Sequence, residues 1–260
     1  MVHWPSSRRN GSAEIAWYAV TAATLLLIGG LIRFGPASAL DAQGKPYNPF
    51  PPMTFVLLRG LALTGQIVGL SLLCSLLGGI LVGIGRVSRY RVANFAASVY
   101  VETIRGVPLL VLLFMIYFGL NQFLPPGQKL SAFASAVLGL SICYSAFMGE
   151  AVRAGIEAIP PEEIEAGVLE GTTAQVFWHV ILPRALRTVL PAVANEFIAL
   201  LKDSSLVSIL AITELTRAGQ EFASSKFLYF ETYTMVALIY LALTLALSRV
   251  VRQLEKSWAA

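Results

Sequence analysis

Apolar residues run in long stretches along most of this chain, and short polar segments separate them. A helix that crosses hydrocarbon needs about 20 predominantly apolar residues, because every backbone polar group must find its partner within the helix. The pattern therefore predicts an all-α integral membrane protein with about six transmembrane helices. The expected spans are residues 14–33, 54–85, 106–121, 130–149, 188–212 and 227–248.

The polar segments between these spans predict loops and surface helices. Residues 41–52 and 121–128 contain several Pro residues together with Gly and Asn, which is typical of loops. Residues 86–105 have charges at their ends and apolar residues at helical spacing, so we expect a short amphipathic helix at the cytoplasmic surface. The longest polar segment, about 150–187, is expected to lie in the cytoplasm.

The distribution of Lys and Arg predicts the orientation, since cytoplasmic loops are enriched in these residues. With both termini inside, the cytoplasm holds eleven of the nineteen basic residues: Arg8, Arg9, Arg86, Arg89, Arg91, Arg153, Arg184, Arg187, Arg249, Arg252 and Lys256. Lys45, Lys129, Arg217 and Lys226 fall outside, and Arg33, Arg59, Arg105 and Lys202 lie at or within span edges. The net charge of +4 then reflects membrane orientation, and no nucleic-acid partner is expected.

The first hydrophobic stretch has two interpretations. Arg8 and Arg9 precede it, and Ala37–Ala39 resembles a signal-peptidase site, which is the arrangement of a cleaved leader. The apolar run from Ile15 to Ile32 is longer than the usual core of a signal peptide, so we favour an uncleaved first span.

No segment of the chain predicts catalysis. The phosphate-binding pattern Gly-x-x-x-x-Gly-Lys-Ser/Thr is absent, as are Gly-x-Ser-x-Gly, His-Glu-x-x-His and Cys-x-x-Cys. Cys74 and Cys143 fall within apolar spans, and His3 and His179 stand apart from any pattern with ligand spacing. We therefore expect no enzyme activity, no metal site and no cofactor bound by this chain.

An acidic stretch interrupts the apolar pattern between Ile159 and Gln175. Pro160 and Pro161 favour a helix start, Glu162 and Glu163 suit the first turn, and Gly171 is placed to end the helix. An inert connector is one interpretation of this segment. A passive connector needs only a few residues, however, and small residues such as Ala166 and Gly167 permit close approach of another backbone, which favours a docking element.

The same stretch resembles the EAA loop of ABC importer permeases. Glu165, Ala166 and Gly167, then Gly171, then the sequence Val-Ile-Leu-Pro ending at Pro183 occupy the positions of that motif. Two features depart from it: the third residue is Gly, and eight residues separate Gly171 from the Val-Ile-Leu-Pro sequence where the motif has nine.

Three further blocks are similar to permeases for histidine, glutamine, glutamate and arginine: Tyr100–Leu120, Tyr144–Pro160 and Leu182–Gln220. The resemblance implies a type I ABC importer permease fold at residues 54–250, with its EAA loop at about 150–187. An N-terminal segment, 1–53, would carry an additional span, since the family commonly has five, and 251–260 would form a cytoplasmic tail.

The resemblance also implies function, partners and location. The chain would be a multi-pass subunit of the bacterial inner membrane, with both termini cytoplasmic, that passes polar amino acids across the lipid bilayer. Its partners would be an ABC ATPase dimer that binds ATP and Mg²⁺, an extracytoplasmic amino-acid-binding protein, and a second permease subunit, identical or different. Residues expected to couple it to the ATPase are Glu163, Glu165, Ala166, Gly167, Gly171 and Pro183.

Ionisable residues within or beside the spans are candidates for the substrate pathway, because a charge in hydrocarbon is costly unless it faces a cavity or a partner. An amino acid needs an acceptor for its ammonium group and a donor for its carboxylate. The candidates are Glu102, Arg105, Asn195, Glu196, Lys202, Asp203, Ser204 and Ser205. Structural roles remain open alternatives: Glu102 with Arg105 as an ion pair at the cytoplasmic rim, and Lys202 with Asp203 as a mutual pair or as groups exposed by a helix break.

Two other function classes compete with the importer. An ion-coupled secondary transporter would show inverted repeats with broken helices in both halves, and the sequence shows none. A membrane anchor or assembly protein would not require Lys202 and Asp203 inside a span.

Overall fold

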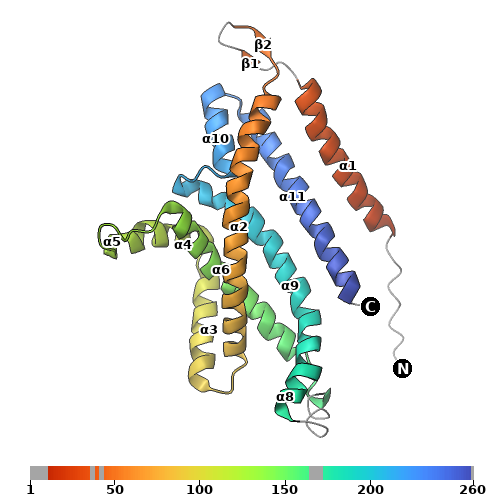
Figure 1. Cartoon of the computed structure of the whole chain (residues 1–260), viewed down its shortest axis with the longest axis vertical. Helices are drawn as coiled ribbons and strands as arrows, with labels where there is room; N and C mark the ends of the chain where they lie inside the picture. Colours follow the sequence, from red (N-terminus) through yellow and green to blue (C-terminus); the bar gives the residue numbers. More distant parts are fainter. Residues whose placement is uncertain (1–10, 36–38, 41–43, 164–171, 259–260) are drawn as a thin grey trace.

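The computed structural model describes residues 11–35, 39–40, 44–163 and 172–258. The chain is almost entirely helical (Figure 1). Its elements are α1 (Gly11–Phe34), β1 (Ala39–Leu40), β2 (Pro46–Tyr47), α2 (Phe50–Arg86), α3 (Arg91–Gly106), α4 (Leu109–Phe114), the π-helix η1 (Met115–Leu120), α5 (Asn121–Phe123), α6 (Ala132–Glu157), α8 (Thr173–Val176), the π-helix η2 (Phe177–Ile181), α9 (Leu182–Asp203), the 3-10 helix η3 (Ser204–Leu210), α10 (Leu215–Lys226) and α11 (Tyr229–Trp258).

Helix α2 runs along most of the length of the molecule (Figure 1). Helices α3 and α6 pack against it toward one end, where α8 also lies, and α10 packs against it toward the other end. The short β1–β2 hairpin precedes α2 at that second end, with Ala39 paired to Tyr47. Helix α1 lies against α11. The outcome is a bundle organised around one long helix.

Within the part of the chain that the structure describes, four helices are long and apolar enough to cross a membrane. They are Glu14–Phe34, Phe50–Arg86, Ala132–Glu157 and Tyr229–Gln253. A fifth span exists if α3 and the segment Leu109–Phe123 are counted together, although a bend of 103° separates them. The predicted membrane fold is confirmed, whereas the count of six spans is not.

The two remaining predicted spans explain the difference. Residues 106–121 begin at the bend, where Pro108 holds Val107 in an extended conformation (φ −101°, ψ 131°), so α3 cannot continue straight into α4. Residues 188–212 are divided between α9 and η3, and α9 carries several ionisable side chains, which lowers its hydropathy below that of a simple span.

Two predicted loops also need correction. The loop expected at 41–52 ends early, because α2 begins at Phe50 with Pro51 and Pro52 in its first turn, where the missing N–H groups cost nothing. The loop expected at 121–128 begins with the helical turn of α5. A helix is present in the region expected at 86–105, as α3, and it packs on α2 and α6; its predicted place at the cytoplasmic surface stays a prediction.

Close contact between α2 and α6 depends on glycine. A Cβ atom placed on Gly79 would lie 2.6 Å from the Met148 Cβ, and one on Gly83 would lie 2.5 Å from the Val152 Cβ. The reverse holds for Gly149, where an added Cβ would lie 2.6 Å from the Val82 Cγ1. Apolar helices gain little from burial against each other in lipid, so short-range packing of this kind holds them together.

The buried residues form two clusters on either side of this framework. One gathers Ile67 of α2, Leu113 of α4, Leu140 of α6 and Leu200 of α9, all fully buried. The other lies nearer the hairpin and joins α2 to α10 and α11 through Met53, Leu57, Leu215 and Met235. The first cluster lies where the predicted pathway residues of α9 meet α6.

We expect Gly79→Val to lower the free energy of unfolding by about 1–3 kcal/mol, because the added atoms have no space against α6. Thermal unfolding of the purified protein in detergent measures the change. Gly69→Val in the same helix is the control, since an added Cβ at Gly69 would meet nothing within 4 Å. Equal stability of the two variants would contradict the proposed basis of the α2–α6 contact.

Candidate functional site

Helix α9 carries most of the predicted pathway residues, and its two ends are irregular. The π-helix η2 precedes it, Pro183 occupies its first turn, and Pro191 lies in its interior. After Asp203 the chain tightens into the 3-10 helix η3, which ends at Ala211 in the left-handed conformation. Asp203 therefore lies at the point where the α-helix stops.

The Asp203 carboxylate is bound by a tyrosine of α6. The Tyr144 hydroxyl donates a hydrogen bond to Asp203 Oδ2 at 2.8 Å, and the Tyr144 side chain is buried. A charged acceptor strengthens such a bond. The contact fixes the end of α9 against the middle of α6. Tyr144 lies in one of the blocks that carry the family resemblance, but no sequence pattern assigned it a partner.

Glu196 lies near this bond, and Arg105 lies near Glu196. Glu196 is close enough to interact electrostatically with both Arg105 and Asp203, so one cation and two carboxylates gather here. The Arg105 guanidinium also lies over the Phe147 ring, 5.3 Å from its centroid. We name Arg105, Tyr144, Glu196 and Asp203 the central polar cluster. It joins α3, α6 and α9, and it offers both acceptors and donors to a zwitterion.

The other predicted pathway residues lie around this cluster. Asn195 and Lys202 are exposed side chains of α9. Ser204 is buried and its hydroxyl donates to the Leu201 carbonyl oxygen at 2.8 Å, while Ser205 is half-buried. None of the ion pairs between described residues joins Lys202 to Asp203, so the expected alternative of a mutual pair is not seen.

Glu102 lies apart from the central polar cluster. Its carboxylate is 3.7 Å from Arg86 Nη1, and its side chain is 75% exposed. Within the described ranges the expected pair with Arg105 is not formed, because Arg105 turns toward Phe147 instead. Glu102 is thus an ion-pair partner at the end of α2, as the structural alternative supposed, but with a different cation.

An ion-pair network that the sequence did not predict joins the ends of α2 and α6. Arg86 Nη2 lies 3.3 Å from Glu150 Oε2, and Arg153 Nε donates to the same oxygen at 2.9 Å. Arg153 also pairs with Glu157 one turn further along α6. The i,i+3 and i,i+4 spacings of the α6 residues were visible in the sequence, whereas the contact with Arg86 required the fold.

The loop predicted at about 150–187 is described only at its two sides. Residues 161–163 are helical, in agreement with the predicted start at Pro160 and Pro161. The predicted coupling residues Glu165, Ala166, Gly167 and Gly171 lie outside the described residues. Glu163 and Pro183 line a pocket of about 280 Å³ together with His179, Val180, Arg184 and Arg187. Across it, Arg184 Nη1 lies 3.2 Å from Glu163 Oε1.

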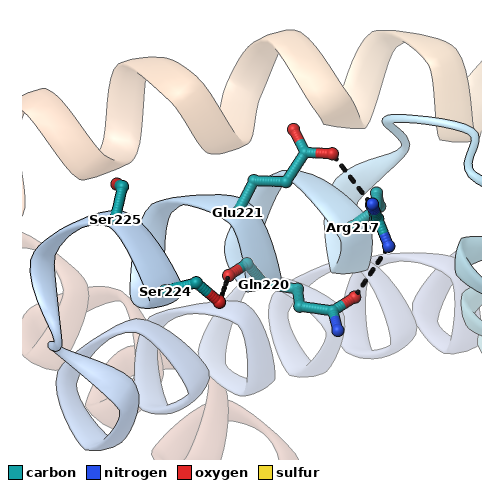
Figure 2. A pocket seen from close by; sticks show the side chains of 5 residues that line it. All are labelled: Arg217, Gln220, Glu221, Ser224 and Ser225. Atoms are coloured by element: carbon teal, nitrogen blue, oxygen red, sulfur yellow. Dashed lines mark hydrogen bonds and ion pairs between the residues drawn. The ribbon is translucent and has the colours of Figure 1, made fainter.

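A second pocket of about 420 Å³ lies on the outer face of α10 (Figure 2). Arg217 pairs with Glu221 at 2.8 Å and donates to Gln220, and Ser224 and Ser225 complete the lining. The opposite face of α10 packs on α2 and α11. The two faces make α10 an amphipathic helix whose polar side is open.

Glu214 fastens the start of α10. Its buried carboxylate accepts hydrogen bonds from the Arg217 and Thr216 backbone amides at 2.8 and 2.9 Å, and from the Thr64 and Tyr240 hydroxyls at 3.4 Å each. Burial raises the pKa of this carboxyl, and the backbone bonds from Thr216 and Arg217 oppose that rise. No sequence signal indicated this role, because the side chains that usually cap a helix N-terminus are those of Ser, Thr, Asp and Asn.

Comparison with known proteins identifies the fold and its use. Residues 75–259, more than half of the chain, match the family described as "Binding-protein-dependent transport system inner membrane component". The chain belongs to this family. It is a permease, which is a transport subunit and not an enzyme, and the family assignment predicted from the EAA loop is confirmed. No match supports a secondary transporter or an assembly protein.

Several relatives of the permease are similar along nearly their whole length. The probable amino-acid ABC transporter permease protein PatM of Vibrio harveyi is 36% identical over 80% of this chain and 94% of its own. The glutamine transport system permease protein GlnP of Escherichia coli K12 is 35% identical over 79% and 94%. The arginine transport system permease protein ArtQ of Bacillus subtilis is 33% identical over 79% and 93%.

Solved structures agree with these relatives. A chain from the crystal structure of an amino acid ABC transporter with histidines superposes with a TM-score of 0.74 at 37% identity, covering 80% of the permease and 96% of that chain. A chain of the inward-facing MetNI methionine ABC transporter gives a TM-score of 0.69 at 21% identity, over 80% and 98%, which supports the fold alone. The type I importer fold predicted from the sequence is confirmed.

We expect Tyr144→Phe to lower solute uptake about tenfold when the permease works in its complete transport system, because the Asp203 carboxylate loses its buried donor. The initial rate of uptake into proteoliposomes measures this. Tyr117→Phe is the control, since the Tyr117 hydroxyl makes no hydrogen bond to any described residue and its ring packs on Phe118. Wild-type uptake by Tyr144→Phe would exclude the Tyr144–Asp203 bond from the pathway.

Proposed function

We propose that this permease is the membrane-spanning subunit of an ATP-driven ABC importer for polar amino acids. The observation that carries the proposal is the agreement among relatives: PatM, GlnP and ArtQ are named as amino-acid, glutamine and arginine permeases, and each is similar to this chain over more than nine tenths of its own length. The likeness to a solved amino acid ABC transporter at 37% identity supports the same substrate class.

The central polar cluster supplies the chemistry that such a substrate requires. The Asp203 and Glu196 carboxylates are acceptors for an α-ammonium group, and the Arg105 guanidinium is a planar donor for an α-carboxylate. Lys202 and Asn195 extend the polar surface of α9 on its exposed side. Ionisable groups at this depth cost free energy unless they face water or a partner, so the cluster is proposed to line the passage.

The partners proposed for the permease are an ABC ATPase dimer, an extracytoplasmic amino-acid-binding protein and a second permease subunit, identical or different. The family description, a binding-protein-dependent transport system, supports the binding protein. ATP and Mg²⁺ are assigned to the ATPase, and no cofactor is assigned to this chain.

Both termini are proposed to lie in the cytoplasm of the bacterial cell. The eleven-to-four distribution of basic residues supports this, as does the position of the start of α1 and the end of α11 at the same end of the molecule (Figure 1).

The coupling element is proposed to be the loop of residues 150–187. Its described sides are joined by the pair between Glu163, which precedes the part of the EAA motif that lies outside the described residues, and Arg184, just after Pro183. Because Glu163 is already paired within the chain, it would position the loop, leaving the ATPase contact to Glu165 and Gly171. The ion-pair network of Arg86, Glu150 and Arg153 fastens the adjoining end of α6 to α2. Movement of the loop would then reach α6 and α9 together.

The central experiment is reconstitution of the permease in proteoliposomes with and without its ATPase and binding protein. We expect uptake of a polar amino acid only when both proteins are present and ATP is supplied on the side of the membrane where the ATPase is bound. Uptake driven by an ion gradient in the absence of the ATPase would overturn the proposal and favour a secondary transporter.

The Glu163–Arg184 pair gives a second prediction. We expect Glu163→Gln and Arg184→Gln each to lower the ratio of amino acid transported to ATP hydrolysed by about two- to fivefold, as befits an exposed ion pair. The reversed pair, Glu163→Arg with Arg184→Glu, should restore the ratio. Arg187→Gln is the control, because Arg187 lines the same pocket without an ion pair among the described residues. Failure of the reversed pair to restore coupling would show that Glu163 contacts the ATPase directly.

A further inference from the structure

Helix α1 belongs to a part of the chain that the compared proteins lack. About 80% of this chain covers 94 to 96% of PatM and of the solved amino acid transporter chain, and the family match extends from residue 75 to residue 259. The additional residues therefore lie mainly before the family match. They include an apolar helix that the proposed transport function does not use.

One end of α1 is fastened to α2 by Asn48. Its side-chain amide donates to the carbonyl oxygens of Leu31 at 3.3 Å and Ile32 at 3.1 Å, in the last turn of α1. Its side-chain oxygen accepts from the Phe50 amide, which opens α2, at 3.0 Å. One side chain thus binds the Ile32 carbonyl at the end of one helix and an amide at the start of the next, and it adds a second donor to the Leu31 carbonyl, which also accepts from the Gly35 amide at 2.9 Å.

The other end of α1 is fastened to α11 by Arg249. The Arg249 guanidinium lies over two aromatic rings of α1, 5.2 Å from the Trp17 centroid and 4.9 Å from the Tyr18 centroid, and it also donates a hydrogen bond to the Tyr18 hydroxyl. The two rings meet edge to face with centroids 5.0 Å apart. A cation held by two rings is a specific attachment, and Trp and Tyr favour the membrane boundary, where a guanidinium reaches water.

Between these two ends α1 has few buried side chains. Leu25, Leu26 and Leu27 are all more than half exposed, and only 6% of the span is buried inside the protein. In lipid an apolar helix gains little by leaving hydrocarbon for another apolar surface, so polar and close-range contacts decide whether it stays attached. Asn48 and Arg249 are those contacts.

The segment after α1 is also built into the protein. Ala39, the residue after which a signal peptidase would cut, is buried, pairs with Tyr47 in the hairpin and belongs to the cluster around Phe50 and Met53. Gly35 packs so closely on Phe50 that an added Cβ would lie 2.4 Å from its ring. Cutting between Ala39 and Leu40 would divide the first strand of the hairpin.

We propose that α1 is a permanent helix of the permease, docked on the lipid-facing side of α11 by Arg249 and tied to α2 by Asn48, and that it is not a cleaved leader. Its outer surface contacts lipid. This inference does not depend on which solute the permease carries.

The first test is the mass of the full chain purified from membranes through a C-terminal tag. We expect the 28.0 kDa of all 260 residues plus the tag. A mature protein that begins at Leu40 would overturn the proposal.

The second test separates α1 from the rest by cutting. A site for a sequence-specific protease is inserted between residues 41 and 44, the purified protein is cut, and the fraction of the α1 fragment that stays with the tagged remainder is measured after gel filtration in detergent. We expect the wild-type fragment to remain bound and Arg249→Gln to weaken its association about tenfold. Arg252→Gln, one turn along the exposed side of α11, is the matched control and should retain the fragment.

Two variants confined to α1 guard against misfolding of the core. Trp17→Leu should release the fragment as Arg249→Gln does, and Tyr18→Phe, which keeps the ring and loses the hydroxyl, should release less. Because these changes lie outside residues 39–260, the remainder should elute unchanged. Two outcomes would overturn the proposed attachment. In the first, the wild-type fragment is released as much as the Arg249→Gln fragment; in the second, both Arg249→Gln and Trp17→Leu retain the fragment fully.

Discussion

The bundle of the permease is built on the close contact between α2 and α6. In lipid two apolar helices associate only when their surfaces fit at short range, and Gly79, Gly83 and Gly149 permit that fit by having no side chains. The same device recurs at the other end of α2, where an added Cβ on Gly60 would lie 2.9 Å from the Ala218 Cβ of α10. One long helix therefore contacts α6 through one set of glycines and α10 through Gly60.

Polar groups enter this framework where a regular helix ends. Asp203 lies at the change from α-helix to 3-10 helix, Arg105 immediately precedes the bend at Gly106–Pro108, and Glu214 caps the start of α10. At such points the backbone leaves amides and carbonyls free to bind side chains or water, and non-helical backbone at membrane depth is tolerated only where it is covered by protein or lines an aqueous space. Asp203 and Arg105 thereby belong to the central polar cluster between α3, α6 and α9, whereas Glu214 is held between α10, α2 and α11.

The sequence was sufficient for the fold class and the family, and insufficient for the local geometry that makes the site. Hydropathy alone located the four helices that qualify as spans, because an apolar run of about 20 residues with few charges is typical of a transmembrane helix. It did not anticipate that the chain turns at Pro108, within residues 106–121, or that residues 188–212 change from α-helix to 3-10 helix after Asp203. A local apolar average does not register a bend or a change of helix type.

The partners of the charged residues were likewise out of reach of the sequence. Spacing suggested that Glu102 would meet Arg105, yet Glu102 meets Arg86 from α2, and Arg105 lies over Phe147 from α6. Tyr144 and Glu214 bind across more than 50 and about 150 positions of sequence, respectively, so only the packed helices bring their partners to them. The roles of Glu165, Ala166, Gly167 and Gly171 remain predictions from the motif.

Pro191 gives α9 a mechanical property that its neighbours do not share. A proline inside a helix has no N–H to offer the carbonyl oxygen four residues earlier, which here belongs to Arg187, and its ring presses on that same group. Helix α9 is thus weakest between Arg187 and Pro191, where one backbone hydrogen bond is missing. Force applied at the Pro183 end of α9 can bend the helix near Pro191, so the segment before Pro191 and the segment that bears Asp203 need not tilt equally.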